Sequence, residues 1–253
     1  MLDEADARIH ATTRKLLEQN LALQLHLADI AHDLKTPLTA VQLALEEAAK
    51  RVKDEASKEH LASSLDDCVY LAAMIDNLRV GVELRDGSPE GLSQGRAELG
   101  GIVEQVVRRL GLLGRFKQVE LNMARPGHEV WCACRPLVLE RVVDNLVYNA
   151  VSHGRPGDHV AVLLASAGDS FELTVLDDGP GMKPEELAEL GRRWFRGEGA
   201  DLRAPRGSGL GIGIVHEVCR RAGWELSFEP NAPEGLKVTV RGALLVTGVQ
   251  ALV

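Results

Sequence analysis

The sequence contains few aromatic residues and no long apolar segment. Phe, Trp and Tyr make up only 4% of its 253 residues, so a hydrophobic core has to be built from Leu, Val, Ala and Ile. No apolar run approaches the roughly 20 residues that a membrane-spanning helix needs, and the segment that begins Met1-Leu-Asp-Glu lacks the features of a signal peptide. The net charge of −8 argues against bulk electrostatic binding to nucleic acid or to anionic lipid.

Cysteine is also scarce. Four cysteines in a chain of this length do not suggest a disulfide framework, so we expect reduced thiols. Cys132 and Cys134 could form half of a metal site, but no second Cys or His pair has zinc spacing. Because Val130, Cys132 and Cys134 alternate as along a strand, we expect both thiols to be buried. We predict a cytoplasmic protein, or the cytoplasmic part of a longer membrane-attached protein, with no membrane span in this chain.

The first third of the sequence predicts long helices. A helical pattern runs from about 6 to 53, and its early part has apolar residues every seven positions, at Ile9, Leu16, Leu23 and Ile30. We assign 1–27 to a coiled-coil lead-in helix and 28–84 to an antiparallel helical hairpin. The second helix of this hairpin carries an apolar face formed by Leu61, Leu65, Cys68, Ala72 and Ile75. Two helices cannot bury this surface alone, so we expect a homodimer that forms a four-helix bundle.

The segment from Ile30 to Leu38 within the first helix combines unusual side chains. His32 is followed directly by Asp33, and Thr36 lies one helical turn after His32 on the same face. Pro37 cannot donate a backbone hydrogen bond and predicts a bend at this point. A titratable imidazole beside a carboxylate and a hydroxyl leads us to the hypothesis that His32 accepts a phosphoryl group.

The rest of the chain predicts a second, mixed domain. Residues 85–97 are expected to form a linker, since 85–95 are rich in Gly, Ser and Pro, and we assign 98–245 to the domain and 246–253 to a tail. Expected helices cover 100–113, 136–153 and 209–222, and expected strands cover 117–123, 128–134, 158–166, 170–177, 224–229 and 236–241. Paired strands with helices on one side predict a two-layer α/β sandwich.

Several features of this second domain suggest a nucleotide site. Asn145 and Asn149 lie one turn apart on the helix expected at 136–153, and an amide oxygen is a suitable ligand for Mg²⁺ when phosphates supply other ligands. The alternative is a pair of amides on a solvated helix face. Asp177 ends an apolar strand, where its carboxylate could accept a hydrogen bond from an exocyclic amine such as that of adenine. The alternative for this segment is an ordinary Gly-Pro turn.

Glycines follow both of these features. Gly179 and Gly181 come directly after Asp177 and permit close backbone approach. A second run, Gly207-Ser-Gly209-Leu210-Gly211, opens the helix expected at 209–222, where free backbone N–H groups can cradle phosphate oxygens. The connection over 182–206 is longer than most and rich in arginine, which suggests a lid over polyphosphate. Each signal is weak alone, and the lid arginines could belong to a merely solvated loop.

Together, in this order, the motifs resemble those of the sensor histidine kinases of two-component signalling. The segment from His32 to Leu38 resembles the family's H box, and 139–154 resembles its N box. Asp177 to Gly181, residues 194–197 and Gly207 to Gly211 resemble the G1, F and G2 boxes. The resemblance covers roughly residues 25 to 242. It implies a dimeric helical hairpin followed by a two-layer α/β sandwich that binds ATP.

The resemblance also implies roles for the hairpin residues. His32 would be phosphorylated through its Nε2 by the γ-phosphate of ATP, and Asp33 would orient the ring and take its proton. Thr36 matches the position that places a water molecule in members that dephosphorylate their partner. The phosphoryl group would then pass to an aspartate of a response regulator, which would dock on the hairpin.

For the second domain, the resemblance implies an ATP site with Mg²⁺. Asn149 would bind Mg²⁺, Asn145 would lie beside the phosphates, and Asp177 would recognise adenine. The nucleotide and its lid would be lined by Gly179, Gly181, Gly207, Gly209, Leu210 and Gly211. Three positions depart from the family pattern: Ser152 replaces a basic residue, Arg135 replaces an aspartate and Gly191 replaces a phenylalanine.

Two other functions remain open at this stage. An ATPase of the gyrase, MutL or Hsp90 type would share the nucleotide fold, but the DNA-acting members have a water-activating glutamate four residues before the first Asn. That position is Arg141 in this sequence, and Glu140 is one residue away from it. A dimeric scaffold that binds ATP or a regulator without turnover is the other alternative, which the complete set of glycine motifs disfavours.

Overall fold

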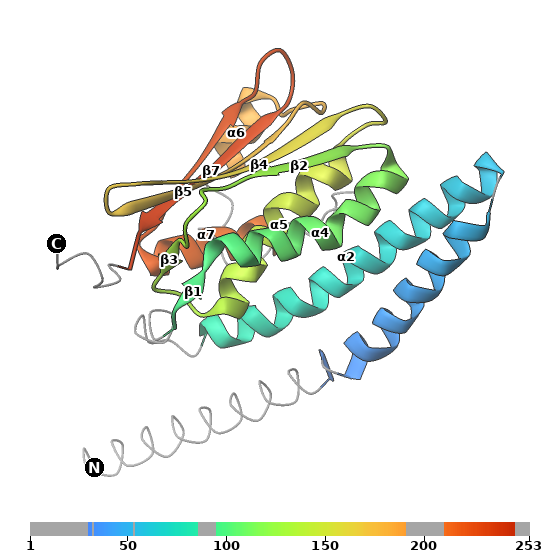
Figure 1. Ribbon diagram of the computed structural model, residues 1–253, viewed down its shortest axis with the longest axis horizontal. Coiled ribbons are helices and arrows are strands. Elements are labelled where there is room, and N and C mark those ends of the chain that lie inside the picture. Colours follow the sequence, from blue (N-terminus) through green and yellow to red (C-terminus); the bar gives the residue numbers. More distant parts are fainter. Residues whose placement is uncertain (1–29, 32, 53, 86–94, 191–209, 246–253) are drawn as a thin grey trace, which may run out of the picture.

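The computed structural model describes residues 30–31, 33–52, 54–85, 95–190 and 210–245 (Figure 1). The heptads before Ile30, the candidate acceptor His32, and Gly207 and Gly209 lie outside the described residues. Within them, none of the helices combines the length and the apolarity that crossing a membrane requires.

The described part of the chain begins with two helices that run side by side (Figure 1). Residues 30–31 and 33–51 are helical, and Pro37 lies within this helix. Helix α2 spans Glu55–Arg85, and the carboxylate of Asp54 accepts a hydrogen bond from the backbone N–H of Ser57 at 2.8 Å. This contact satisfies one of the free N–H groups at the start of α2. The predicted helical hairpin is therefore confirmed.

A five-stranded sheet forms one layer of the second domain. Its strands are β2 (Glu120–Ala124), β4 (His159–Ala167), β5 (Ser170–Asp177), β6 (Glu225–Pro230) and β7 (Leu236–Ala243), in the spatial order β2-β4-β5-β7-β6. Strands β2 and β4 are parallel, and the other neighbours are antiparallel. Along β4, Val160, Val162 and Leu164 are buried at alternate positions, as a sheet with one covered face requires.

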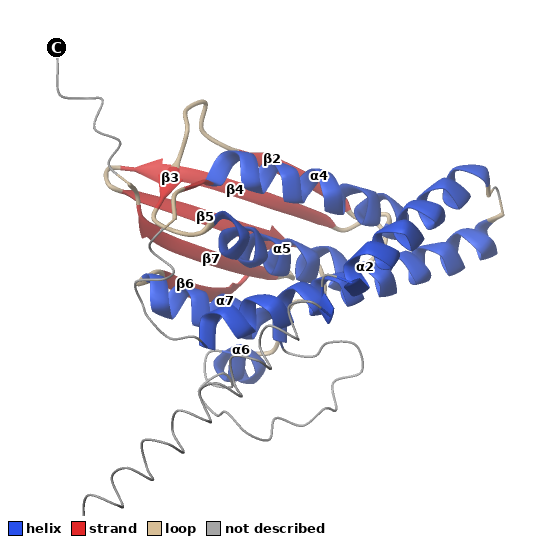
Figure 2. Ribbon diagram, turned by 90° about the horizontal axis from the view of Figure 1, so that it is seen from below, coloured by secondary structure: helices blue, strands red, loops and turns tan. Residues whose placement is uncertain are grey.

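Three helices cover this face of the sheet: α4 (Leu99–Lys117), α5 (Pro136–His153) and α7 (Leu210–Ala222), as Figure 2 shows. Buried Leu and Val residues dominate the core between the two layers, and Phe171 packs edge-on against Trp224 with ring centroids 5.2 Å apart. The predicted two-layer α/β sandwich is therefore confirmed.

Two local expectations were wrong. The strand expected at 128–134 is only β3 (Trp131–Cys132), which pairs with β1 (Ala97–Glu98) outside the main sheet. The segment expected to be a loop from 182 begins with helix α6 (Pro184–Leu190). Proline at the first position and two glutamates in the first turn favour a helix start, and the backbone N–H of Lys183 donates to the carboxylate of Glu186.

Cys132 and Cys134 are core residues, as predicted. Cys132, Cys134 and Cys219 are buried, and burial raises the pKa of the Cys134 and Cys219 thiols to about 12. Such thiols stay protonated at neutral pH when no metal is bound. The described residues contain no group of three or more His, Cys, Asp or Glu side chains that could hold a metal ion.

Helix α2 also packs against the second domain, across α4, α5 and α7 (Figure 2). Val80 and Leu84 of α2 are 1% and 3% exposed and belong to the same apolar core as the helices of the sandwich. Gly81 lies beside α7, where a Cβ atom would come 3.7 Å from Cδ1 of Ile214. The hairpin and the sandwich therefore share a buried interface.

Candidate functional site

Helix α5 carries the two candidate amides. It begins at Pro136 and buries Leu139, Val142, Val143 and Leu146, which recur at helical spacing. Asn145 and Asn149 lie one turn apart, as predicted, but their surroundings differ. Asn145 is only 4% exposed, whereas Asn149 is partly exposed.

The side chain of Asn145 is enclosed by three elements. Its Nδ2 donates to Oδ1 of Asn77 on α2 at 3.0 Å and to the backbone oxygen of Arg141 at 2.8 Å. Its Oδ1 accepts from Nδ2 of Asn77 at 3.0 Å. On the side of α7, a Cβ atom at Gly211 would lie 2.8 Å from the same oxygen, so only glycine fits there without displacement. The structure therefore brings Asn145 and Gly211 together, as the sequence suggested, and adds Asn77.

Asp177 is the last residue of β5 and is partly buried. Its Oδ1 accepts hydrogen bonds from the backbone N–H groups of Gly179 at 3.1 Å and Leu236 at 3.3 Å. Burial raises the pKa of the Asp177 carboxyl, and these two hydrogen bonds oppose that shift. Both bonds end on Oδ1, so Oδ2 is the atom that could accept from an exocyclic amine.

The connection between β6 and β7 supports Asp177. The side-chain amide of Asn231 donates to the backbone oxygen of Asp177 at 2.8 Å. Gly235, at φ +123°, passes so close that a Cβ atom there would lie 2.0 Å from that oxygen. Gly181 also has positive φ, at +63°, and faces the backbone of Gly235. Sequence reasoning found Gly181 but not Asn231 or Gly235, because nothing in their local pattern indicates that they contact β5.

The remaining predicted site residues fall into three groups. Gly179 is buried beside Asp177, and Leu210 is the first residue of α7. Asp33 and Thr36 lie on the first hairpin helix and are exposed. The acceptor His32, the glycines Gly207 and Gly209 and the lid from 191 onwards fall outside the described part of the chain.

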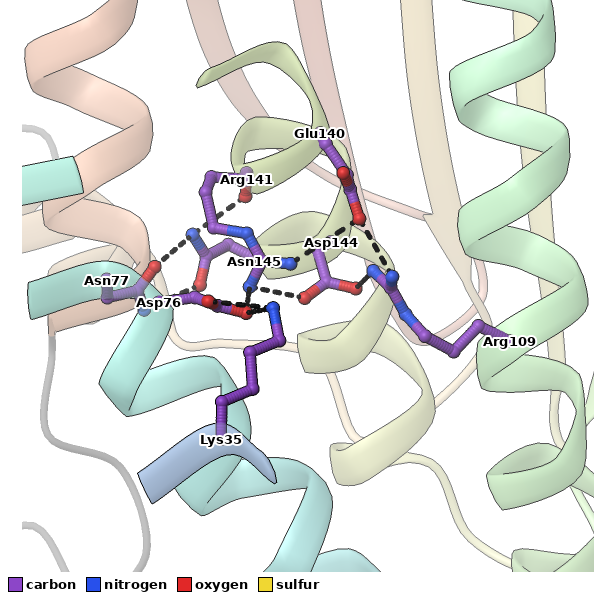
Figure 3. A network of polar contacts seen from close by, with 8 residues as sticks. All are labelled: Lys35, Asp76, Asn77, Arg109, Glu140, Arg141, Asp144 and Asn145. Carbon is purple, nitrogen blue, oxygen red and sulfur yellow. Dashed lines mark hydrogen bonds and ion pairs between the residues drawn. The ribbon is translucent and has the colours of Figure 1, made fainter. Parts of the chain in front are cut away.

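A charged network joins the hairpin to α5, and sequence reasoning missed it (Figure 3). Nζ of Lys35 contacts both carboxylate oxygens of Asp76 on α2, at 3.0 and 2.9 Å. Arg141 on α5 is 3% exposed, and its Nη1 lies 3.2 Å from Oδ2 of Asp76 and 2.9 Å from Oδ2 of Asp144. Arg109 of α4 in turn pairs with Asp144 and with Glu140, the latter at 2.8 Å.

A second polar contact lies further along α5. Asp66 of α2 accepts hydrogen bonds from the hydroxyl of Tyr148 at 3.0 Å and from Nζ of Lys117 at 3.2 Å. Lys117 also donates to the backbone oxygen of Ser152, and the hydroxyl of Ser152 lies 3.4 Å from Asp66. Burial raises the pKa of the Tyr148 hydroxyl, so this group stays a donor at neutral pH. The position where a basic residue was expected is thus next to a lysine from α4.

The arrangement suits a nucleotide. An acidic acceptor ends β5, two amides line α5, and a glycine-containing segment begins α7, where backbone N–H groups favour anions. A Cβ atom at Gly179, two residues after Asp177, would lie 3.8 Å from Cα of Gly154, the residue that follows α5. The ends of α5 and β5 therefore lie side by side.

Comparison with protein families finds two matches, one in the first third of the chain and one in the second domain. Residues 22–80 match the family described as "His Kinase A (phospho-acceptor) domain". Residues 134–244 match the family described as "Histidine kinase-, DNA gyrase B-, and HSP90-like ATPase". The first match includes His32, Asp33 and Thr36, and the second includes Asn145, Asn149, Asp177 and the glycine motifs.

Curated sensor proteins are similar to most of this chain. The sensor protein CseC of Streptomyces avermitilis is 33% identical over 256 residues, which cover 96% of this chain and 46% of CseC. The sensor protein QseC of Salmonella typhi is 27% identical over 214 residues, 85% of this chain and 46% of QseC. The chain spans about half the length of the curated relatives it matches.

Solved structures share the fold. The mycobacterial sensor histidine kinase MprB is 26% identical with a TM-score of 0.50, covering 59% of this chain and 98% of the other. The Acinetobacter baumannii histidine kinase AdeS has a TM-score of 0.52 at 19% identity, covering 84% of this chain and 98% of AdeS.

Proposed function

The chain belongs to the sensor histidine kinases of two-component signalling, and on this premise we propose that it transfers the γ-phosphoryl group of ATP to His32. One observation carries the proposal. A phosphoacceptor domain that contains His32 precedes, in the same chain, a nucleotide domain that contains Asn145, Asn149 and Asp177. One chain would thereby carry both the binding site of the phosphoryl donor and the phosphoryl acceptor.

The second domain would bind the nucleotide as its magnesium complex. Oδ2 of Asp177 would accept a hydrogen bond from the adenine amine, while Oδ1 stays bound to backbone N–H groups. Asn145 and the N-terminus of α7 would lie at the phosphates. The partly exposed amide of Asn149 has the oxygen donor that Mg²⁺ prefers, and the ion arrives with ATP as part of the substrate. In phosphoryl transfer, Mg²⁺ neutralises the charge that develops on the phosphate oxygens.

The hairpin would supply the acceptor. A bond forms between Nε2 of His32 and the γ-phosphorus, the bond from that phosphorus to the β,γ-bridging oxygen breaks, and ADP leaves. Asp33 would orient the imidazole and take its proton. The phosphohistidine would then pass the phosphoryl group to an aspartate of a response regulator. Thr36 would position water for a separate reaction, in which the phosphoryl group passes from the regulator's aspartate to water and inorganic phosphate leaves.

A second copy of the chain completes the proposed assembly. Ile30, Leu34, Val41, Leu71 and Leu78 of the hairpin are large apolar residues that remain 46 to 50% exposed in the single chain. A homodimeric four-helix bundle would cover them. The proposed location is the cytoplasmic side of a signalling system, where response regulators are found.

An ATPase without protein phosphorylation is less well supported. In the DNA-acting relatives, a glutamate at the position of Arg141 activates water. Arg141 instead pairs with Asp76 and Asp144, and a guanidinium cannot act as a base at neutral pH. The phosphoacceptor match over residues 22–80 also has no role in such an enzyme.

Incubation with γ-labelled ATP and Mg²⁺ tests the proposal. We expect acid-labile label on the protein, which disappears in His32→Gln and persists in His60→Gln. His60 is a matched control because it is exposed on α2, and the hydroxyl of Ser64 donates to its backbone oxygen rather than to its imidazole. Label that survives in His32→Gln would overturn the assignment of the acceptor. Free phosphate without labelled protein would instead support the ATPase.

A further inference from the structure

Two adjacent residues of α2, Asp76 and Asn77, carry the central polar contacts between the hairpin and α5. Each is 6% exposed, and their partners Arg141 and Asn145 are 3% and 4% exposed. In Figure 3, Asp76 and Asn77 both point from α2 toward this part of α5. We refer to Asp76 and Asn77 together as the α2 latch. Because one partner of the latch is a candidate nucleotide ligand, the contact bears on access to the ATP site.

The hydrogen bonds of Asn145 explain how the α2 latch affects access to the ATP site. A side-chain amide has two N–H donors on Nδ2. In Asn145, one of them binds Oδ1 of Asn77 and the other binds the backbone oxygen of Arg141. Phosphate oxygens are acceptors, so they need a donor. While Asn77 holds its place, Asn145 has no N–H left for a nucleotide.

The network of ion pairs around Asp76 has equal numbers of positive and negative side chains, but one of its buried nitrogen atoms lacks a hydrogen bond. Three cations (Lys35, Arg109 and Arg141) and three anions (Asp76, Glu140 and Asp144) form the network. Nε of Arg141 is buried without a hydrogen-bond partner among the described residues. A buried ion pair whose desolvation is only partly compensated adds little net stability. Such a contact can hold an orientation and still open when a competing interaction is offered.

We infer that the packed arrangement of α2 is a resting conformation in which the latch withholds Asn145 from the nucleotide. The inference rests on the proposed function, because Asn145 matters only if this site binds ATP. Opening would release Nδ2 of Asn145 toward the N-terminus of α7, where Gly211 lies beside it. Nucleotide binding and separation of α2 from α5 are then linked, and each favours the other.

Lys35 extends this link to the first helix of the hairpin. It lies three residues after His32, and its ion pair with Asp76 joins the acceptor helix to the latch. A displacement of the first helix would pull on the same carboxylate that pairs with Arg141. The latch thereby connects the position of the acceptor helix to the availability of Asn145.

The affinity for nucleotide should depend directly on the fraction of molecules in which the latch is open. When only a fraction of molecules is competent to bind, the apparent Kd equals the intrinsic Kd divided by that fraction. Variants that weaken the latch should therefore bind more tightly, although they lose contacts. A merely structural role would give the opposite result or none.

The test measures the Kd of the non-hydrolysable ATP analogue AMPPNP with Mg²⁺ by titration calorimetry. The rate of hydrogen exchange at the backbone amides of α2 is measured in parallel. Asn77→Ala removes the amide pair, and Asp76→Asn keeps the shape of the side chain but removes its charge. The matched control is Asn122→Ala, because Asn122 is exposed on β2 and its amide donates only to Glu120. We expect the apparent Kd of both latch variants to fall by about threefold or more, with faster exchange in α2, and no change in the control.

Each outcome decides the question. Equal or weaker AMPPNP binding in both latch variants would overturn the inference, even if His32 is labelled normally. Tighter binding in the latch variants without labelling of His32 would support the latch and contradict the proposed kinase reaction. If the unchanged chain and the variants all fail to bind AMPPNP, both the inference and the proposed ATP site are wrong.

Discussion

At the scale of single residues, Asp177 is the group whose ionisation opposes folding. Its folded-state pKa is raised because burial disfavours the charged carboxylate. Between the ordinary pKa of an aspartate and this raised value, the folded chain binds more protons than the unfolded chain. Stability therefore falls as the pH rises through that interval, and the full penalty is present above the raised pKa.

Asp177→Asn should therefore stabilise the protein and impair nucleotide binding. The amide oxygen can still accept from Gly179 and Leu236, but no charge is buried. We expect the Tm at pH 7 to rise by about 1–3 °C, with a smaller gain as the pH approaches the ordinary carboxyl pKa. The Kd of MgADP should rise by about tenfold or more, because a charge-assisted hydrogen bond to the adenine amine is lost.

Scanning calorimetry across pH and nucleotide titration check these two effects. Asp169→Asn is the matched control, because Asp169 is an exposed aspartate in the turn between β4 and β5. A lower Tm in Asp177→Asn at pH 7 would contradict the penalty assigned to the buried carboxylate.

The sequence predicts which residues are chemically equipped for the site, but not what surrounds them. Asp177 is recognisable because it ends an apolar strand and precedes two glycines. Its supports Asn231 and Leu236 lie more than fifty positions away in the sequence, so no local pattern connects them to it. The partner of Asn145 is Asn77, and that contact depends on how α2 docks.

At the scale of elements, strongly periodic segments were predictable. Helix α5 and strand β5 have the bounds that the apolar spacing predicts, 136–153 and 170–177. The segment at 128–134 has strand-like alternation, yet only Trp131–Cys132 pairs, with β1. Alternation shows that a segment can be half buried, whereas the choice of a partner strand depends on the whole fold.

The turn between β6 and β7 offers a test at this scale. Gly235→Ala would place a Cβ atom 2.0 Å from the backbone oxygen of Asp177, at a φ of +123° that alanine rarely adopts. We expect a loss of about 2 kcal/mol or more in the free energy of unfolding, a Tm lower by about 4 °C or more, and weaker MgADP binding.

Urea unfolding and nucleotide titration measure these effects. Gly127→Ala is the control, because Gly127 is exposed and a Cβ atom there would contact nothing within 4 Å. Equal stability of the two variants would show that the turn can shift away from β5.

At the scale of the whole molecule, α2 has two different faces. One face packs on the nucleotide domain through Asp76, Asn77 and Val80, which are almost fully buried. Leu71 and Leu78 lie seven residues apart and are 47% and 48% exposed, so they share another face. Ile30, Leu34 and Val41 of the first helix are also exposed. The hairpin thus retains an apolar surface after it has packed on its own second domain.

Self-association through that surface is the prediction that follows. The double variant Leu71→Lys with Leu78→Lys would place four lysines in a homodimeric bundle. Because Leu71 and Leu78 are 47% and 48% exposed in the single chain, each replacement forfeits about half of the roughly 1.5–3 kcal/mol that full burial of a leucine contributes. We expect sedimentation equilibrium to show a dimer for the unchanged chain and a monomer for the double variant at micromolar concentration.

Leu163→Lys is the control for a lost apolar side chain, because Leu163 is 41% exposed on β4, far in sequence from the hairpin. It should remain dimeric. Since α2 meets the nucleotide domain through its other face, the monomeric variant should still bind AMPPNP with Mg²⁺. A double variant that stays dimeric, or a control that dissociates, would place the subunit interface elsewhere. Loss of AMPPNP binding together with the dimer would show that the two faces of α2 are not independent.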